Sequence, residues 1–360
     1  MAGTGIPAAQ IPGLIADTLA HYKDKSKIKI AQEYQSYFFI DHVFQEDRYD
    51  VQDGSSVEYR FITDDNGQAR HANYMEGRTI NLRDDTLIGS APWTLADNVA
   101  VWEVHQIQMN KGASKLLDTL KKAYAKAYAS LFRVLESRAV LAPDSSTDTR
   151  NPYGLQYWFS GLPSGTTNYS GGWLGTTSRY GDGTSTTTVG GLNKITNAKA
   201  RNWAFNHNGI TQQTLDAMRT ALVYTEFRVP RTLKQFYSPE NAKRKILTSL
   251  AYQVEYERLV NQIGPDGRNK DLNPFYGNAL TFRGVEWVGM PTLESVSLNP
   301  IYCVDFAYFK PIVHSNWWLR EDEVMRDREQ PHIYSRQIDC WYSYCMEMPR
   351  MAGFSGHAVW

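Results

Sequence analysis

The 360-residue chain has few cysteines, no net charge and no long apolar run. Its three cysteines, Cys303, Cys340 and Cys345, form no C-x-x-C pair and leave at least one thiol without a disulfide partner, which favours synthesis in a reducing cytoplasm. The 38 basic residues balance the 38 acidic ones, so no chain-wide field draws the protein to nucleic acid or to an acidic membrane. Residues 1–13 lack the basic and apolar regions of a signal peptide, and no run is long enough to span a bilayer, so we expect no membrane contact.

The sequence also lacks the motifs that catalysis and nucleotide binding usually require. It contains no P-loop, no G-x-S-x-G elbow, no H-E-x-x-H pair and no complete dinucleotide fingerprint. His42 lies near three acids, but no second histidine or cysteine is at hand to complete a usual metal-ligand set, so we interpret it as a surface histidine. We therefore expect no enzyme, with no catalytic residue, no cofactor and no metal.

Aromatic residues and paired carboxylates leave one alternative from another class open. The chain has 10 tryptophans and 22 tyrosines, which are typical of subunit interfaces but would also suit a carbohydrate-binding groove. The acids of Asp64-Asp65, Asp84-Asp85 and Glu321-Asp322-Glu323 could supply a glycosidase acid and base. Adjacent acids in turns are usually solvated, so we interpret these runs as surface loops.

Residues 1–53 form an arm without enough apolar pattern for a core of its own. Within it Lys23, Lys25, Lys27 and Lys29 recur at every second position, which in an extended chain places all four ammonium groups on one face. This pattern favours a solvated or subunit-bridging strand, and contact of the arm with packaged DNA is the alternative.

Residues 54–110 have the pattern of a long hairpin. Strand-like runs cover Val57–Thr63, Thr79–Ile88 and Val99–Gln108, and the first two are separated by a turn that contains Asn66-Gly67. The hairpin carries too many charges for a buried sheet, so we expect much of it to project from the body and to contact other subunits. The charged residues expected at these contacts are Arg60, Arg70, Arg78, Arg83, Asp84 and Asp85.

The apolar period then changes from two to 3.6, and residues 113–140 predict the longest helix of the protein. At about 1.5 Å per residue the helix would run about 40 Å. The expected buried stripe is Leu117, Leu120, Tyr124, Tyr128, Leu131 and Leu135.

The second half of the chain predicts mixed α and β structure around a sheet. Residues 151–189 are rich in Gly, Ser and Thr, but their aromatics indicate that much of this long loop is packed. We expect helices over Thr211–Tyr224 and from Ser238 onward. The expected strands are Thr232–Tyr237, Phe282–Trp287, Ile301–Phe309 and His332–Met346.

This order of a basic arm, a charged hairpin, one long helix and a mixed body resembles the tailed-bacteriophage major capsid protein of the Hong Kong ninety-seven type. Asn151-Pro152-Tyr153-Gly154-Leu155 is similar to the family's return segment after its long helix. Val189-Gly190-Gly191-Leu192-Asn193, followed by Asn202-Trp203, resembles the Gly-Gly turn and downstream tryptophan of many such coats. Phe282-Arg283-Gly284-Val285 resembles a strand-turn late in these chains.

The resemblance implies an α+β phage major capsid fold with five parts. These are an N-terminal arm (1–53), an extended β-hairpin loop with its return strand (54–110), a peripheral domain (111–204) with the spine helix 113–140, an axial domain (205–330), and a strand that returns to the peripheral domain before the C-terminus (331–360).

The resemblance also implies the function of a major capsid protein, made in the host cytoplasm, that self-assembles into hexamers and pentamers of an icosahedral virion around double-stranded DNA. Its expected partners are other copies of itself, a portal, a decoration or cement protein, and packaged DNA through weak non-specific contacts. A separately encoded scaffolding protein is expected because no long extra domain precedes the arm. An encapsulin-like shell, which shares the fold and encloses protein, is the structural alternative.

Some members of the family cross-link their shells through a loop lysine that forms an isopeptide bond with an asparagine of a neighbouring subunit. This chain has no lysine between Lys29 and Lys111. The guanidinium groups of its loop stay protonated and cannot act as attacking amines. We therefore expect the loop to hold its neighbour by non-covalent contacts alone.

Overall fold

The computed structural model describes residues 37–44, 49–62, 69–71, 73, 76–77, 86–103, 105, 113–227, 244–263, 275–276 and 279–359. Several expectations lie outside these residues. They are the four arm lysines (Lys23, Lys25, Lys27 and Lys29), Arg78, Arg83, Asp84, Asp85, the strand at 232–237 and the helix start at Ser238.

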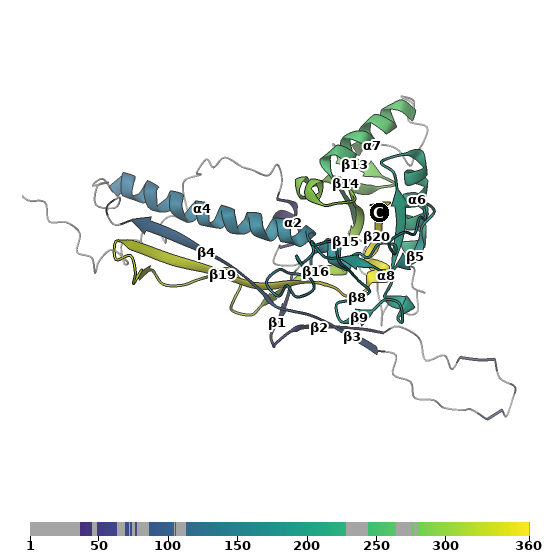
Figure 1. The fold of residues 1–360 in the computed structure, drawn as a ribbon, viewed down its shortest axis with the longest axis horizontal. Helices are drawn as coiled ribbons and strands as arrows, with labels where there is room; N and C mark the ends of the chain where they lie inside the picture. The colour runs from purple at the N-terminus through teal and green to yellow at the C-terminus, as the bar shows by residue number, and fades with distance from the viewer. Residues whose placement is uncertain are drawn as a thin grey trace, which may run out of the picture.

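The spine of the molecule is helix α4 (Ala113–Val140), which has the bounds that the 3.6-residue period predicts. It lies along a ladder formed by β4 (Thr94–Glu103) and β19 (Ile333–Met346) (Figure 1). Leu120, Leu131 and Leu135 are buried, as predicted, because this face of the helix packs on the ladder. The indole N–H of Trp102 in β4 also donates to the Leu120 carbonyl at 3.3 Å, which fixes the helix on the strand.

Strand β19 is the centre of a six-stranded sheet. It pairs with β4 along one side and with three shorter strands along the other, and β1 extends the sheet beyond β16. The shorter elements of this sheet are β1 (Asp50–Gln52), β16 (Phe309–His314), β17 (Arg320–Glu321) and β18 (Met325–Arg326). Among the described residues β4 pairs with β19 alone, so its other side is a free edge of ten residues.

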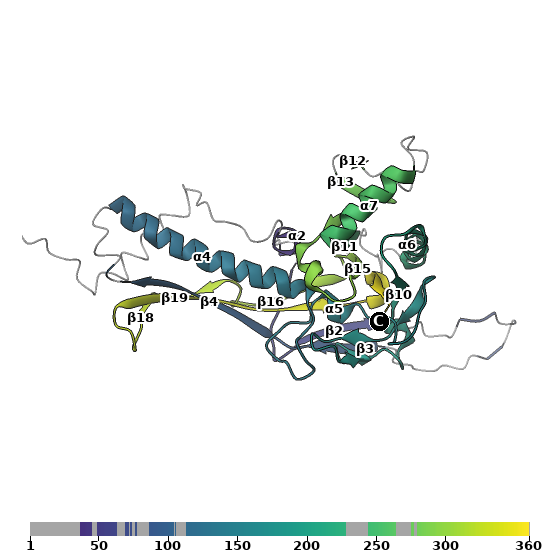
Figure 2. The same cartoon turned by 45° about the horizontal axis from the view of Figure 1, so that its top comes forward.

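An eight-stranded sheet with its own core forms the other end of the molecule (Figures 1 and 2). Helix α6 (Gln212–Thr225) packs on β10 and β20, and α7 (Leu250–Ile263) packs on β14. Thr211 caps α6 by accepting the Thr214 N–H, which explains why this helix begins where the sequence predicts. In spatial order the strands are β12 (Phe275–Tyr276), β13 (Ala279–Phe282), β14 (Val285–Gly289), β11 (Arg244–Thr248), β15 (Ile301–Asp305), β20 (Gly353–Ala358), β10 (Asn202–His207) and β5 (Gly172–Gly175).

Strands β2 (Val57–Ile62) and β3 (Thr86–Ala91) form the base of the expected hairpin. Tyr59 anchors this base, because its hydroxyl donates to the Gly190 carbonyl at 2.9 Å and its ring meets Trp158 edge to face. Gly190 lies in the tight turn between β8 (Thr188–Val189) and β9 (Leu192–Asn193) with φ of 55°. A Cβ there would come within 2.4 Å of the Tyr59 hydroxyl, so the turn requires glycine.

Three expectations differ from the structure in detail. The strand expected at Ile301–Phe309 is not one strand, because β15 ends at Asp305 in the eight-stranded sheet and β16 begins at Phe309 in the six-stranded sheet. Strand β4 begins at Thr94, five residues before the predicted start, because Asp97 and Asn98 also pair with β19. The strand expected at Phe282–Trp287 is two strands, since Arg283 and Gly284 both have positive φ and reverse the chain between β13 and β14.

The loop expected at 151–189 is packed, as its aromatics indicate, and contains short regular elements. Tyr157, Trp158 and Phe159 are all buried. The elements are α5 (Leu155–Trp158), β5, β6 (Ser178–Arg179), β7 (Ser185–Thr186) and β8; one further short helix, η2 (Ala198–Ala200), follows β9.

Three short elements remain, and the last of them, α8, connects the six-stranded sheet to the eight-stranded sheet. They are α2 (Phe38–His42) before β1, η5 (Pro291–Ser295) before β15, and α8 (Pro349–Ala352) between β19 and β20.

Candidate inter-subunit surfaces

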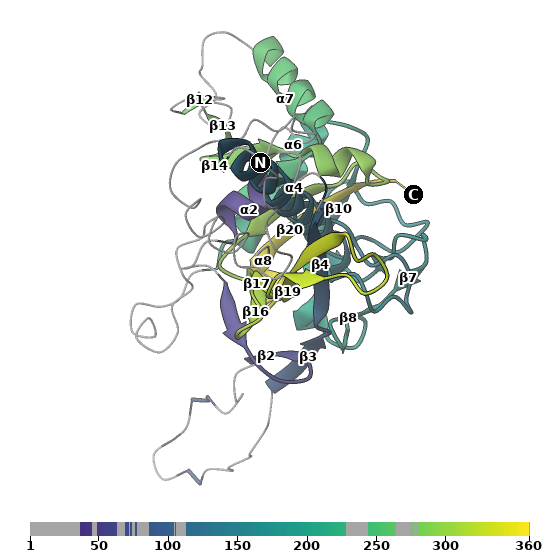
Figure 3. The same ribbon diagram turned by 90° about the vertical axis from the view of Figure 1, so that its left-hand side faces the viewer.

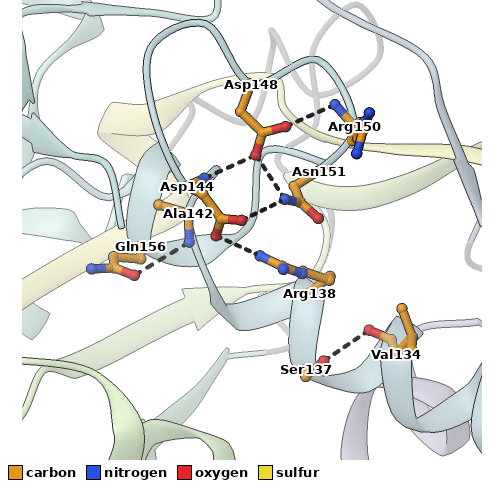
Figure 4. Close-up of polar contacts among 9 residues, drawn as sticks. All are labelled: Val134, Ser137, Arg138, Ala142, Asp144, Asp148, Arg150, Asn151 and Gln156. Carbon is orange, nitrogen blue, oxygen red and sulfur yellow. Dashed lines mark hydrogen bonds and ion pairs between the residues drawn. The ribbon is translucent and has the colours of Figure 1, made fainter. Parts of the chain in front are cut away.

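A polar cluster fixes the chain as it leaves the spine helix (Figure 4). Arg138 pairs with Asp144 at 3.1 Å, and the Asn151 amide donates to both Asp144 and Asp148 at 3.1 and 2.7 Å. Burial alone would raise the pKa of Asp148, but hydrogen bonds from Asn151 and from backbone N–H groups lower it. The segment that resembles the return segment of phage coats is thus held rigidly against the end of α4.

A buried lysine joins this region to the eight-stranded sheet. The Lys194 ammonium donates to the Trp158 carbonyl, to the Ser160 hydroxyl at 2.7 Å and to the Asn202 side chain at 3.3 Å. Burial lowers the pKa of Lys194 to about 7. The Asn202 amide continues the network to Ser355 at 3.0 Å in β20, so four distant segments share one set of hydrogen bonds.

Two carboxylates attach other elements to the spine helix. Glu136, which is 1% exposed, accepts the backbone N–H groups of Phe39 and Ile40 and so holds α2. Glu321 in β17 pairs with Arg336 at 2.8 Å and accepts the hydroxyls of Tyr124 and Tyr128 from α4. The half-buried Glu321 therefore links the sheet to the helix. The interpretation of its acidic run as a solvated surface loop is wrong for this residue.

The face of β4 that points away from α4 is exposed and largely apolar. Leu95, Val99 and Val101 are 48%, 41% and 49% exposed, and Asp97 and Glu103 lie on the same face. Such a row of exposed apolar side chains makes this face a candidate contact surface. The alternation from Leu95 to Val101 indicates this exposed face in the sequence. The predicted strand began at Val99 and therefore covered only the end of the alternation.

A groove with a volume of ≈ 490 Å³ runs beside the free edge of β4, between this strand and α4. Its walls combine apolar groups, polar groups and two lysines. The lining residues are Asn98, Val99, Val101, Trp102, Lys122, Ala123, Lys126, Ala127 and Ser130.

The hairpin β2–β3 offers a second exposed surface. Ile62 is 72% exposed and Ile88 is 52% exposed. Arg60 projects from β2 beside Glu58 at 3.4 Å, and Arg70 pairs with Glu76 at 2.9 Å while donating to the Gly77 carbonyl. The structure thus places two of the six hairpin residues expected at subunit contacts, Arg60 and Arg70, on exposed surface; Arg78, Arg83, Asp84 and Asp85 are not described.

The described tryptophans, which could have formed a carbohydrate platform, are all buried or partly buried. Trp102, Trp158, Trp203 and Trp287 are buried, and no tryptophan in the described part of the chain has the exposure of a free surface residue.

The His42 ring stacks on Phe38 with 5.1 Å between the ring centroids. Within the described ranges no group of three or more His, Cys, Asp or Glu side chains is arranged to hold a metal ion.

The three cysteines are free thiols, each buried in one of the two cores. None of the described helices is both long and apolar enough to cross a bilayer.

Comparison with known proteins gives matches in structure and not in sequence. No protein-family model matches the chain, and no curated protein matches it. Among solved structures it is similar to the cyanophage A-1(L) capsid asymmetric unit, with a TM-score of 0.58 and 13% identity over 94% of this chain and 96% of that one.

Two further capsids show the same likeness. The capsid of Myoviridae phage XM1 gives a TM-score of 0.52 at 12% identity over 99% of this chain and 100% of that one. The capsid of a native GTA particle gives 0.52 at 9% identity over 93% and 95%. Because the matches cover nearly the whole of each chain, the protein has the Hong Kong ninety-seven type α+β fold of tailed-phage capsid proteins.

Proposed function

We propose that the protein is the major capsid protein of a tailed bacteriophage, which assembles into hexamers and pentamers of an icosahedral head around double-stranded DNA. The observation that carries the proposal is the likeness of fold to phage capsids over 94–99% of this chain. We therefore also propose that it is not an enzyme and that it resides in the virion.

The exposed surfaces support the proposal physically. A strand edge of ten residues that no described residue pairs, an apolar strand face and a hairpin with exposed isoleucines are liabilities for a lone subunit, because they invite association. In a shell each would be covered by a neighbour, and the contacts of one subunit would together exceed a standard interface of about 1,600 Å².

In this proposal the parts of the chain take the roles expected from the sequence. Residues 1–53 are the arm, 54–110 the extended loop, 111–204 the peripheral domain, 205–330 the axial domain and 331–360 the return to the peripheral domain. The loop arginines hold a neighbouring subunit through bidentate pairing with carboxylates. A separate scaffolding protein, a portal and a decoration protein complete the proposed set of partners.

Paired substitutions on β4 test the proposed interface. Val99→Asp with Val101→Asp puts two charges on the exposed apolar face without touching the core, so we expect a folded subunit that forms no shell. Val254→Asp on α7, at a residue that is 62% exposed, is the control and should still assemble. Normal shells from the β4 variant would show that this face is free in the particle.

The contents of purified particles separate a phage head from a cargo shell. We expect particles isolated from the natural source to hold nuclease-protected double-stranded DNA. A uniform cargo protein in place of DNA would favour the encapsulin-like alternative.

A further inference from the structure

Two histidines lie together at the outer end of the β4–β19 ladder, which extends away from the eight-stranded sheet in Figure 1 and faces the viewer in Figure 3. His105 lies two residues after Glu103, the last residue of β4, and His332 directly precedes β19. Glu103 pairs with Ile333, the first residue of β19, so the ladder brings the two histidines side by side. Their ring centroids are 5.1 Å apart, with 36° between the ring planes, and both residues are exposed.

Burial does not explain this contact between rings. His207 and His357 also contact aromatic rings, but both of them are buried, so core packing brings those rings together. His105 and His332 are exposed to solvent and have no such packing around them. Their proximity is therefore a property of the surface at this end of the ladder.

The separation of the two rings fits chelation of one tetrahedral ion. A histidine nitrogen binds zinc at about 2.0–2.1 Å, and the centre of an imidazole ring lies about 1.2 Å behind that nitrogen. Two rings on one tetrahedral ion therefore have centroids about 5.2 Å apart, which agrees with the 5.1 Å between His105 and His332. The 36° angle between the ring planes is compatible with chelation, because each ring can turn about its own metal–nitrogen bond.

Hydrogen bonds hold the turn that carries His332. The Asp327 carboxylate accepts the backbone N–H groups of Glu329 and Gln330 at 2.8 and 3.3 Å. The Asp327 N–H donates to the Ile333 carbonyl at 3.0 Å, and the Ile333 N–H donates to the Gln330 carbonyl at 2.9 Å. The backbone at His332 is thus held beside β4 without an ion, which lowers the entropic cost of binding one.

Two imidazoles select a class of ion. Imidazole nitrogen suits Zn²⁺, Ni²⁺ and Cu²⁺, whereas Mg²⁺ and Ca²⁺ prefer oxygen ligands. Among the residues that the structure describes, no third His, Cys, Asp or Glu side chain completes the set, so the other positions on the ion stay open to water. We propose that His105 and His332 form a two-histidine clamp for one divalent transition-metal ion of this class.

The clamp lies within one chain and does not depend on the proposed shell. A bound ion joins the residues after β4 to the start of β19, so it stabilises the folded subunit according to its occupancy. The sequence predicts no metal because His105 and His332 are far apart in the chain, and the pairing of β4 with β19 brings them together.

Copper titration of full-length, dissociated subunits tests the clamp. We expect one tightly bound Cu²⁺ per chain, with two nitrogen ligands in its electron paramagnetic resonance spectrum. His105→Gln and His332→Gln should each leave one nitrogen ligand. Each should also weaken binding by about 10–100-fold, since even the loss of an outer-shell partner has an effect of this size. The exposed His71 is the matched control, and His71→Gln should change neither the affinity nor the spectrum.

Chemical protection gives a second readout in the unaltered chain, so it does not depend on the folding of a variant. Zn²⁺ should protect His105 and His332 from carbethoxylation by diethyl pyrocarbonate, because a coordinated nitrogen cannot react, and peptide masses identify the modified residues. His71 should react equally with and without Zn²⁺. Mg²⁺ should protect none of the three histidines.

Three results would overturn the proposal. They are unchanged copper binding in either clamp variant, loss of binding in His71→Gln, and equal reactivity of His105 and His332 with and without Zn²⁺. Binding by assembled particles but not by free subunits would also overturn it, because the ligands would then come from different copies of the chain.

Discussion

Glu136 offers the sharpest test of how the spine helix holds α2, the described helix of the arm. Its carboxylate is 1% exposed and accepts the Phe39 N–H at 2.9 Å and the Ile40 N–H at 3.1 Å. Burial raises its pKa from 4.5 to about 7, although the backbone hydrogen bonds lower it, and nearby Asp41 adds to the rise. Glu136→Gln keeps the shape and one acceptor oxygen but removes the charge.

Proton linkage gives the sign and the size of the effect of Glu136 on the free energy of unfolding. The folded protein binds a proton at Glu136 more tightly than the unfolded chain does, so this group stabilises the fold below about pH 4.5 and loses that contribution as pH rises through about 7. The shift from 4.5 to about 7 corresponds to a change of about 3 kcal/mol. The glutamine variant has no such dependence, and its lost hydrogen bond costs about 1 kcal/mol at every pH.

Urea unfolding of dissociated subunits, followed by tryptophan fluorescence at pH 4.5, 6 and 8, measures this difference. We expect Glu136→Gln to be slightly less stable than wild type at pH 4.5 and more stable at pH 8, with the free energy difference changing by about 3 kcal/mol. The exposed Glu294→Gln corrects for the general effect of removing one charge. A difference that stays constant from pH 4.5 to 8 would refute the reasoning.

Three further predictions concern the helix, the hairpin and the chemistry of the shell. Leu131→Asp should unfold the subunit, because a buried unpaired charge costs several kcal/mol against a total of about 5–15, whereas Val134→Asp on the exposed side of α4 should fold and be soluble; circular dichroism distinguishes them. Residues 60–85 of the hairpin should exchange their amide hydrogens quickly in free subunits and slowly in shells, and strong protection in a monomer would contradict a neighbour's role. Mature particles boiled in detergent should give a single band near 41.0 kDa, because the loop between Lys29 and Lys111 has no amine to form an isopeptide bond, and a ladder that resists reductant would refute this.

The elements with a strong period were predictable from the sequence. Helix α4 has the predicted bounds of 113–140, because its apolar stripe and the absence of Gly and Pro leave no other local choice. Strand β19 begins one residue after the predicted start and ends at the predicted Met346. The bounds of α4 and β19 follow mainly from the local pattern of apolar residues. Together these two elements support the candidate surfaces.

Strand β20 could not be predicted, because its pattern is set by tertiary packing. Its sequence, Gly-Phe-Ser-Gly-His-Ala, does not alternate, and it lies buried between β15 and β10. Gly353 adopts φ of 136°, and a Cβ there would come within 1.9 Å of the Cys303 carbonyl oxygen. In a sequence, glycine usually indicates a turn, but Gly353 instead permits close contact between two strands.

The candidate surfaces were predictable only in part. The loop charges at Arg60 and Arg70 stood out in sequence because they conflict with a buried sheet. The edge of β4 could not be predicted, because the local sequence does not show which strands pair with β4. The groove beside this edge could not be predicted either, since residues of α4 form its other wall. The buried network of Lys194 gave no signal either, because its partners come from positions far apart in the chain.

Electron microscopy of the purified protein, expressed with and without a co-expressed scaffolding protein, tests the central claim most directly. The proposed capsid function predicts closed icosahedral particles hundreds of ångströms across, uniform in size when the scaffold is present. A protein that remains monomeric under both conditions, and that binds a glycan or a small molecule, would contradict the account.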